Sequence, residues 1–109
     1  MLVVNRFRVP TNATAAGPEA FRADLTAAHG VLAEQAGYVE GWVGRNLDEP
    51  DLWVLTTRWE SVGAYRRALS SYDVKLAAVP TLSRALDEPS AYEVVEPNSV
   101  LNIQDARVT

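Results

Sequence analysis

Two aromatic residues with polar tips, Trp59 and Tyr65, stand six positions apart where a strand-like run meets a helical pattern. A phenol can pass a proton and an indole N–H can donate a hydrogen bond, and both groups need partners when they are buried. Such rings, with a few polar tips, line cavities that accept flat apolar ligands. Two interpretations stay open from these residues: a substrate pocket with proton transfer by Tyr65, or ordinary core packing at a strand-to-helix corner.

A third polar candidate, Asn5, lies between Val3 and Phe7 on the apolar face of the first predicted strand. A buried amide costs free energy unless it is hydrogen-bonded. Asn5 is therefore either a satisfied structural amide or a polar anchor in a cavity between sheet and helices. Further candidates for substrate binding, on these apolar faces or at their flanks, are Phe7, His29, Trp53 and Tyr72.

His29 is the only histidine, and it lies at the flank of the apolar stripe of the first predicted helix. It is either a half-exposed boundary residue or a ligand or general base, since histidine titrates near neutral pH. The absence of cysteine argues against a zinc site. No phosphate-binding glycine loop or nucleophile elbow is present, which argues against nucleotide-dependent enzymes and hydrolases.

Hydrophobic periodicity predicts the elements that hold these residues. Strand patterns cover residues 1–9, 38–47, 52–59 and 91–95, and helical patterns cover 18–36 and 62–79, with a further short turn at 81–86. Ser61 is a suitable N-cap for the second helix. The apolar stripe of that helix comprises Val62, Tyr65, Leu69 and Tyr72. Glycines in the second strand indicate a bulge or a close backbone approach.

This element order predicts an α+β fold, a ferredoxin-like β-α-β-β-α-β antiparallel sheet with both helices on one face. The other face of the sheet then needs a cover, so we predict a homodimer. Residues 1–96 form the domain, and 97–109 form a C-terminal tail. Val100, Leu101 and Ile103 make that tail apolar enough to dock on the partner chain.

Composition narrows the class of protein. The chain has 48% hydrophobic and 22% charged residues, which is ordinary for a globular domain. Its net charge of −4 argues against nucleic acid or an anionic membrane as a partner. Neither a signal-peptide pattern nor a run of roughly 20 apolar residues occurs. With no cysteine, these features predict a cytoplasmic protein.

The chain resembles the antibiotic biosynthesis monooxygenase domain from Leu2 to about Glu96. Beside the element order, the resemblance lies in the runs Trp59-Glu60-Ser61, Ala64-Tyr65 and Gly37-Tyr38. It implies a dimeric α/β barrel made of ferredoxin-like protomers. One branch of the family oxidises polycyclic phenols with O2 and no metal or organic cofactor. Its pocket tryptophan and tyrosine match Trp59 and Tyr65.

The sequence departs from each branch at other positions. Leu55 and Val79 replace a pocket asparagine and an arginine of the cofactor-independent branch. A second branch binds and degrades heme. Asn5 matches the asparagine of that branch, but Ala68 and Ala78 stand where its tryptophan and heme-ligating histidine are expected. The resemblance therefore implies no cofactor, heme included.

Three functions follow as hypotheses. The first is a monooxygenase that acts on a small flat aromatic or polyketide-like substrate with O2. Here Tyr65 transfers protons, Trp59 is a wall and hydrogen-bond donor, and Asn5 anchors an oxyanion. The second is a non-catalytic dimeric binding or assembly module, with Trp59 and Tyr65 as core. The third is a divergent heme-binding protein.

Overall fold

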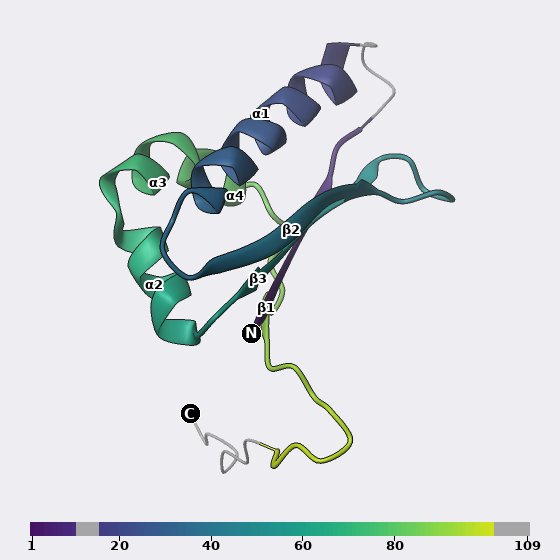
Figure 1. Cartoon of the computed structure of the whole chain (residues 1–109). Coiled ribbons are helices and arrows are strands. Elements are labelled where there is room, and N and C mark those ends of the chain that lie inside the picture. The colour runs from purple at the N-terminus through teal and green to yellow at the C-terminus, as the bar shows by residue number, and fades with distance from the viewer. Residues whose placement is uncertain (11–15, 102–109) are drawn as a thin grey trace.

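The computed structural model describes residues 1–10 and 16–101, apart from the side chain of Ala16. The predicted tail residue Ile103 lies outside this part of the chain. In chain order the elements are β1 (Leu2–Arg8), α1 (Ala16–Ala33), β2 (Tyr38–Arg45), β3 (Leu52–Trp59), α2 (Val62–Ser70), α3 (Tyr72–Ala77), α4 (Val79–Leu82) and β4 (Ala91–Tyr92) (Figure 1).

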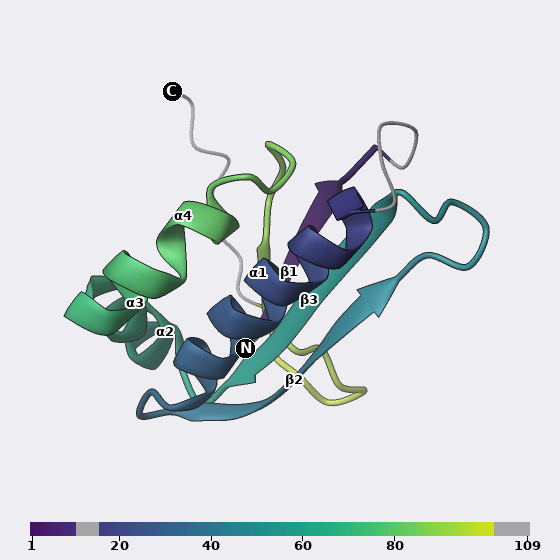
Figure 2. The same ribbon diagram turned by 90° about the horizontal axis from the view of Figure 1, so that it is seen from above.

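The sheet has the strand order β2-β3-β1-β4, and all neighbouring strands are antiparallel. This arrangement confirms the predicted α+β, ferredoxin-like fold. Seen from above, the helices lie together on one side of the sheet (Figure 2). None of the helices in the described part of the chain is both long and apolar enough to cross a membrane.

The core fills the space between the sheet and the helices. Alternate residues of β1 and β3 face it, because side chains along a strand alternate between the two faces. Phe21 of α1 packs between Phe7 and Trp53, at ring-centroid distances of 5.2 and 5.5 Å. The largest side chains of this core with no more than 2% exposure include Trp59, Phe7, Phe21, Leu25, Leu32 and Leu55.

The second predicted helix is divided into α2 and α3, which corrects the prediction of one helix over 62–79. The further short turn predicted at 81–86 is the helix α4, which begins earlier, at Val79. Ser71 has extended backbone angles, and its hydroxyl accepts a hydrogen bond from the Val74 N–H while donating one to the Ala68 carbonyl. Because this cap starts a new helix, the apolar stripe does not continue in phase. Tyr72 and Leu76 are 76% and 65% exposed as a result.

The fourth strand is also shorter than predicted, with only two residues instead of 91–95. The preceding segment instead follows β1 through single contacts. The Leu86 N–H donates to the Arg6 carbonyl, and the Val4 N–H donates to the Ser90 carbonyl. Arg6 also donates two hydrogen bonds to the Glu88 carboxylate, at 2.7 and 2.9 Å. Beyond β4 the chain leaves the body of the domain (Figure 1).

The face of the sheet opposite the helices carries an apolar surface, which we call the open face. Trp42 and Tyr92 are 57% and 47% exposed there. The other apolar members are half-buried and come from the two central strands: Leu2, Val4, Leu52 and Val54. Isolated apolar side chains are normal at a surface, but a continuous patch usually marks an interaction site.

The corner between α1 and β2 depends on Gly37. Its φ of 88° lies in the left-handed region, which residues with a Cβ rarely adopt. A Cβ at this position would also lie 2.3 Å from the Cβ of Ala64 in α2. Gly37 therefore lets the start of β2 approach α2 closely enough for the Gly37 carbonyl to accept the Glu60 N–H at 2.8 Å.

Candidate functional site

The predicted corner between β3 and α2 is built as the sequence indicates. The Ser61 hydroxyl accepts the Ala64 N–H at 3.1 Å, and this N-cap starts α2 directly after β3. Tyr65 then comes one turn into the helix, with its ring centroid 5.4 Å from that of Trp59. The structure brings the two predicted aromatic residues into contact.

Trp59 itself is packed into the core. It is 1% exposed, and its indole N–H donates to the Thr57 hydroxyl at 2.8 Å. In this arrangement its donor is occupied by the protein, so the predicted role of Trp59 as a donor to substrate is not available. What remains is a rigid aromatic wall behind Tyr65.

Tyr65 and Asn5 keep some contact with solvent. Burial raises the pKa of the half-buried Tyr65 phenol, which therefore stays protonated at neutral pH and can donate a proton. Asn5 lies on the helix-facing side of β1 and is partly exposed. Its neighbours Val3 and Phe7 on the same face are each 1% exposed. Asn5 is therefore less buried than its neighbours on the same face of β1.

Sequence reasoning missed Tyr38 as a member of this group. The Tyr38 hydroxyl lies 2.6 Å from Nε2 of His29, and its ring stands edge-on to Trp59 at 5.5 Å. The hairpin alone offered no signal for this contact, because Tyr38 comes to lie opposite Trp59 only through the register shift between Tyr38 and Glu40. His29, Tyr38, Trp59 and Tyr65 therefore form one continuous row.

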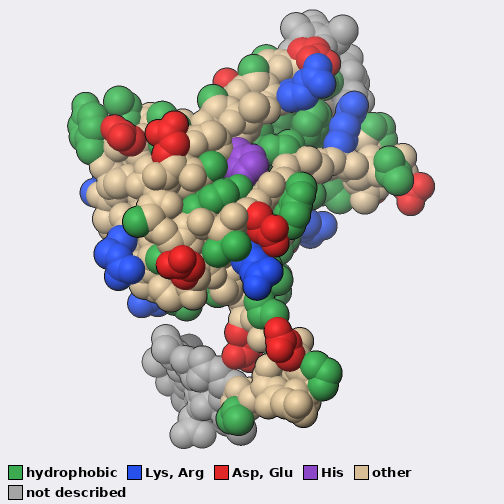
Figure 3. Space-filling model, in the orientation of Figure 1, with side chains coloured by type: hydrophobic (Ala, Val, Ile, Leu, Met, Phe, Trp, Pro, Cys, Tyr) green, Lys and Arg blue, Asp and Glu red, His purple; other side chains and the backbone are tan. Residues whose placement is uncertain are grey.

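The His29–Tyr38 pair requires a glycine beside it. A Cβ on Gly41 would lie 2.8 Å from the Tyr38 hydroxyl and 2.9 Å from Nε2 of His29. This is the close approach that the glycines of the second strand predicted. The predicted bulge lies elsewhere, between Tyr38 and Glu40. Burial raises the pKa of Tyr38, so its hydroxyl stays protonated at neutral pH, and the tautomer of His29 decides which of the two groups donates the hydrogen bond. In the space-filling view the histidine is visible at the surface, among apolar side chains (Figure 3).

We expect His29 to titrate below its ordinary value of 6.5, because burial lowers its pKa. The unfolded chain then binds a proton at higher pH than the folded one. The stability that the neutral ring contributes is complete above pH 6.5 and is lost as the pH falls through the folded pKa. NMR titration of the single histidine measures this midpoint. In His29→Gln the fall of Tm just below pH 6.5 should be smaller than in the wild-type protein. A titration midpoint of His29 at or above 6.5 would contradict the expectation.

The remaining predicted site residues lie apart from this row. Phe7 is 1% exposed and packs on Phe21, while Tyr72 is 76% exposed on α3. Tyr72 therefore points away from the core, because the Ser71 cap changed the phase of the helix. Trp53 lies at the other end of β3 from Trp59 and lines two cavities.

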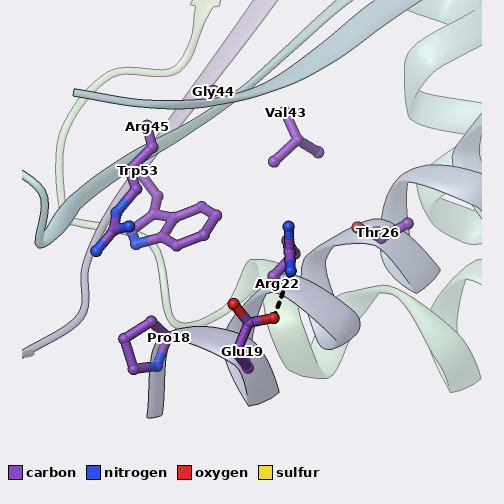
Figure 4. A pocket seen from close by; sticks show the side chains of 8 residues that line it. All are labelled: Pro18, Glu19, Arg22, Thr26, Val43, Gly44, Arg45 and Trp53. Atoms are coloured by element: carbon purple, nitrogen blue, oxygen red, sulfur yellow. Dashed lines mark hydrogen bonds and ion pairs between the residues drawn. The ribbon is translucent and has the colours of Figure 1, made fainter. Parts of the chain in front are cut away.

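One of these cavities is a cleft of about 350 Å³ between α1 and β2. Arg22 and Thr26 enter it from α1, and Arg45 enters it from β2 beside Trp53 (Figure 4). The other, of about 410 Å³, lies near the β2–β3 hairpin and is lined by Arg6, Leu47 and Val54 among others. Sequence reasoning did not identify either, since the arginines come from separate elements with no shared motif.

Comparison with known proteins identifies the family of this chain. Residues 1–79 match the family model described as antibiotic biosynthesis monooxygenase. The chain belongs to this family. Among curated proteins no significant sequence match was found.

Several solved structures share the fold. SnoaB of Streptomyces nogalater, described as a cofactor-independent oxygenase, is 22% identical with a TM-score of 0.65, over 94% of this chain and 96% of that one. A family protein of Deinococcus radiodurans, described as a putative antibiotic biosynthesis monooxygenase, is 21% identical with a TM-score of 0.65, over 96% and 100% of the two chains. A conserved protein of Methanosarcina mazei Go1 is 19% identical with a TM-score of 0.63, over 83% and 84%.

The residues of this family member do not fit heme. At the two positions where the heme-degrading branch is expected to carry tryptophan and histidine, Ala68 and Ala78 are 3% and 0% exposed and offer no ligand atom. Nε2 of His29 is held by Tyr38. Among the described residues, no group of three histidine or carboxylate side chains is placed to hold a metal ion.

Proposed function

We propose that this protein is a cofactor-independent monooxygenase that oxidises a flat phenolic or polyketide-like molecule with O2. Membership of the antibiotic biosynthesis monooxygenase family supports the reaction class. The observation that carries the proposal is the half-buried phenol of Tyr65 against Trp59, on the run that matches the family. Asn5, partly exposed on the helix-facing side of β1, supplies a second polar group on the same layer.

The chain's own residues have defined roles in this proposal. The substrate supplies the electrons: an activated CH2 group and O2 give a carbonyl and one water, which balances the oxidation. The Asn5 amide donates to the phenolate oxygen of the substrate, since a fixed donor stabilises developing charge best in a partly dry site. Tyr65 delivers the proton with which one oxygen atom leaves as water. Trp59 fixes the ring of Tyr65.

Oxygen consumption with anthrone- and naphthol-like phenols tests the proposal. We expect substrate-dependent uptake that falls at least about 100-fold in Tyr65→Phe, the lower end of general acid–base contributions. Tyr72→Phe is the matched control, because Tyr72 is 76% exposed on α3. It should leave the rate unchanged. Equal rates in Tyr65→Phe and wild type, with folding intact, would contradict the role of Tyr65.

One observation favours a second candidate, a non-catalytic binding module. The Trp59 indole is fully packed and its N–H is bound to Thr57, as expected for a structural corner. On this hypothesis the phenols bind without oxygen uptake. Tyr65→Phe then changes neither the affinity for the phenols nor the oxygen uptake. The same oxygen electrode measurement, with calorimetric binding beside it, therefore separates the two functions.

We also propose that the protein is a homodimer in which two open faces meet to form the α/β barrel. The apolar patch on that face supports this assembly, as do Val95 and Val100 of the C-terminal segment, which are 60% and 95% exposed. We propose that residues 97–109 dock on the partner. The proposed working form is a cytoplasmic dimer with an aromatic substrate and O2, and no resident cofactor.

A further inference from the structure

We propose that the cleft between α1 and β2 beside Trp53 is a separate binding site for an aromatic carboxylate. The cleft lies at the far end of β3 from the corner described above. Trp53 and Trp59 are six residues apart on one strand face, which corresponds to about 20 Å. The site therefore does not depend on the proposed oxygenase reaction, and a ligand here leaves Tyr65 uncovered.

The cleft has the size and the apolar walls for a ring system. Its volume of about 350 Å³ lies in the range of small-molecule sites. Trp53, Val43 and Pro18 supply apolar surface from three different elements or their ends. Figure 4 shows their side chains around a common space, with Arg22 reaching in from α1. A flat apolar body fits this space better than a fully hydrated ion.

The polar lining consists mainly of hydrogen-bond donors. Arg22 and Arg45 contribute two guanidinium groups, which always carry charge. The indole N–H of Trp53 is buried in a residue that is 5% exposed, and it has no hydrogen-bond partner within the described chain. Because that nitrogen is itself buried, a ligand in the cleft does not reach it, and the two guanidinium groups are the donors that a ligand meets.

The charges select an anion. Glu19 is the only carboxylate at this lining, and Arg22 already pairs with it. The Arg45 guanidinium carbon lies 5.2 Å from the centre of the Trp53 ring, and its Nε donates to the Pro50 carbonyl. The remaining N–H groups of Arg45 stay available. This local excess of positive charge occurs in a chain of net charge −4, so it is a feature of the cleft and not of the whole surface.

A carboxylate joined to an aromatic ring matches both the apolar part and the positively charged part of the cleft lining. Guanidinium groups bind carboxylates in a planar, bidentate manner. They also stack on aromatic rings, as Arg45 already does on Trp53. The ring of the ligand would contact Val43 and Pro18 while its carboxylate meets the arginines. A neutral ring of the same shape would gain only the apolar part of this binding energy.

Binding of 2-naphthoate, measured by calorimetry at pH 7.5 with 2-naphthamide as the neutral counterpart, tests the site. We expect 2-naphthoate to bind with a Kd below about 1 mM, and the amide at least about tenfold more weakly. Arg22→Gln and Arg45→Gln should each weaken naphthoate binding by about tenfold or more, since each removes a charged donor. Arg66→Gln is the control, because Arg66 is exposed on α2 away from the cleft.

An NMR measurement locates the bound molecule. The three tryptophans give three assignable indole N–H signals. Naphthoate should shift that of Trp53 most, and Tyr65→Phe should leave both the affinity and this shift unchanged. The proposal is overturned by an absence of binding at millimolar naphthoate, by equal affinity for the amide, or by wild-type affinity in both cleft variants. A largest shift at Trp59 would equally overturn it.

Discussion

Replacing Gly37 by alanine is expected to destabilise the protein by about 3 kcal/mol. Two costs combine. A residue with a Cβ held at a φ of 88° is strained by about 1–3 kcal/mol. The new methyl group would also lie 2.3 Å from the Cβ of Ala64, which is 4% exposed, and such overpacking typically costs about 1–3 kcal/mol.

Urea or thermal unfolding of Gly37→Ala measures this effect. We expect Tm to fall by more than about 10 °C. The matched control is Gly30→Ala in α1, where an added Cβ meets no atom within 4 Å. That change should stabilise the helix, by up to about 1 kcal/mol, because alanine is the better helix former. A Gly37→Ala protein as stable as wild type would show that β2 and α2 separate easily at this corner.

Val4→Asp is expected to convert the proposed dimer to a monomer at micromolar protein concentration. Val4 lies on β1, a central strand, on the open face and opposite Thr56 of β3. A carboxylate placed there and its symmetry mate would both be taken out of water in the face-to-face assembly, with Arg6 and Arg58 as the nearest charges on the same face. Removing charges from water costs several kcal/mol per ion, more than such pairs typically return, so the dimer Kd should rise by about 100-fold or more.

Sedimentation equilibrium of both proteins tests this expectation, with circular dichroism to verify the fold. The control is Val62→Asp, the same change at a valine that is 45% exposed in the first turn of α2. An acid is favourable at a helix N-terminus, so this variant should remain dimeric. Trp42→Ala, which removes an exposed ring of the open face, should weaken the proposed dimer without introducing a charge on β1. A wild-type monomer at tens of micromolar would contradict the assembly.

Most of the fold could be predicted because each element is signalled locally. The alternation in β1 and β3, and the Ser61 cap, place those elements as observed. The division of the second helix could not be predicted from periodicity. It depends on whether the Ser71 hydroxyl caps a new helix or stays outward, and tertiary packing decides this. β4 is short for a similar reason: the 86–90 segment pairs with β1 by isolated contacts.

The candidate site was predictable only in part. Contact between Trp59 and Tyr65 followed from the strand-to-helix corner. The hydrogen bond from Trp59 to Thr57 links residues two apart on one strand face, yet rotamers decide whether it forms. Tyr38 approaches His29 across two elements, which no spacing rule links. The Trp53 cleft needs the placement of α1 over β2, a tertiary property.

The order of the strands also sets when the sheet can form. β1 is synthesised first but becomes a central strand. Val4 pairs with Thr56, which lies about 50 residues further along the chain. At about 5–20 residues per second, β1 stays unpaired for roughly 3–10 s on the ribosome. The hairpin of β2 and β3 closes through contacts between neighbouring segments of the chain, so we expect it and α1 to form early. Folding should then be limited by the docking of β1 on β3, since this contact closes the longer loop.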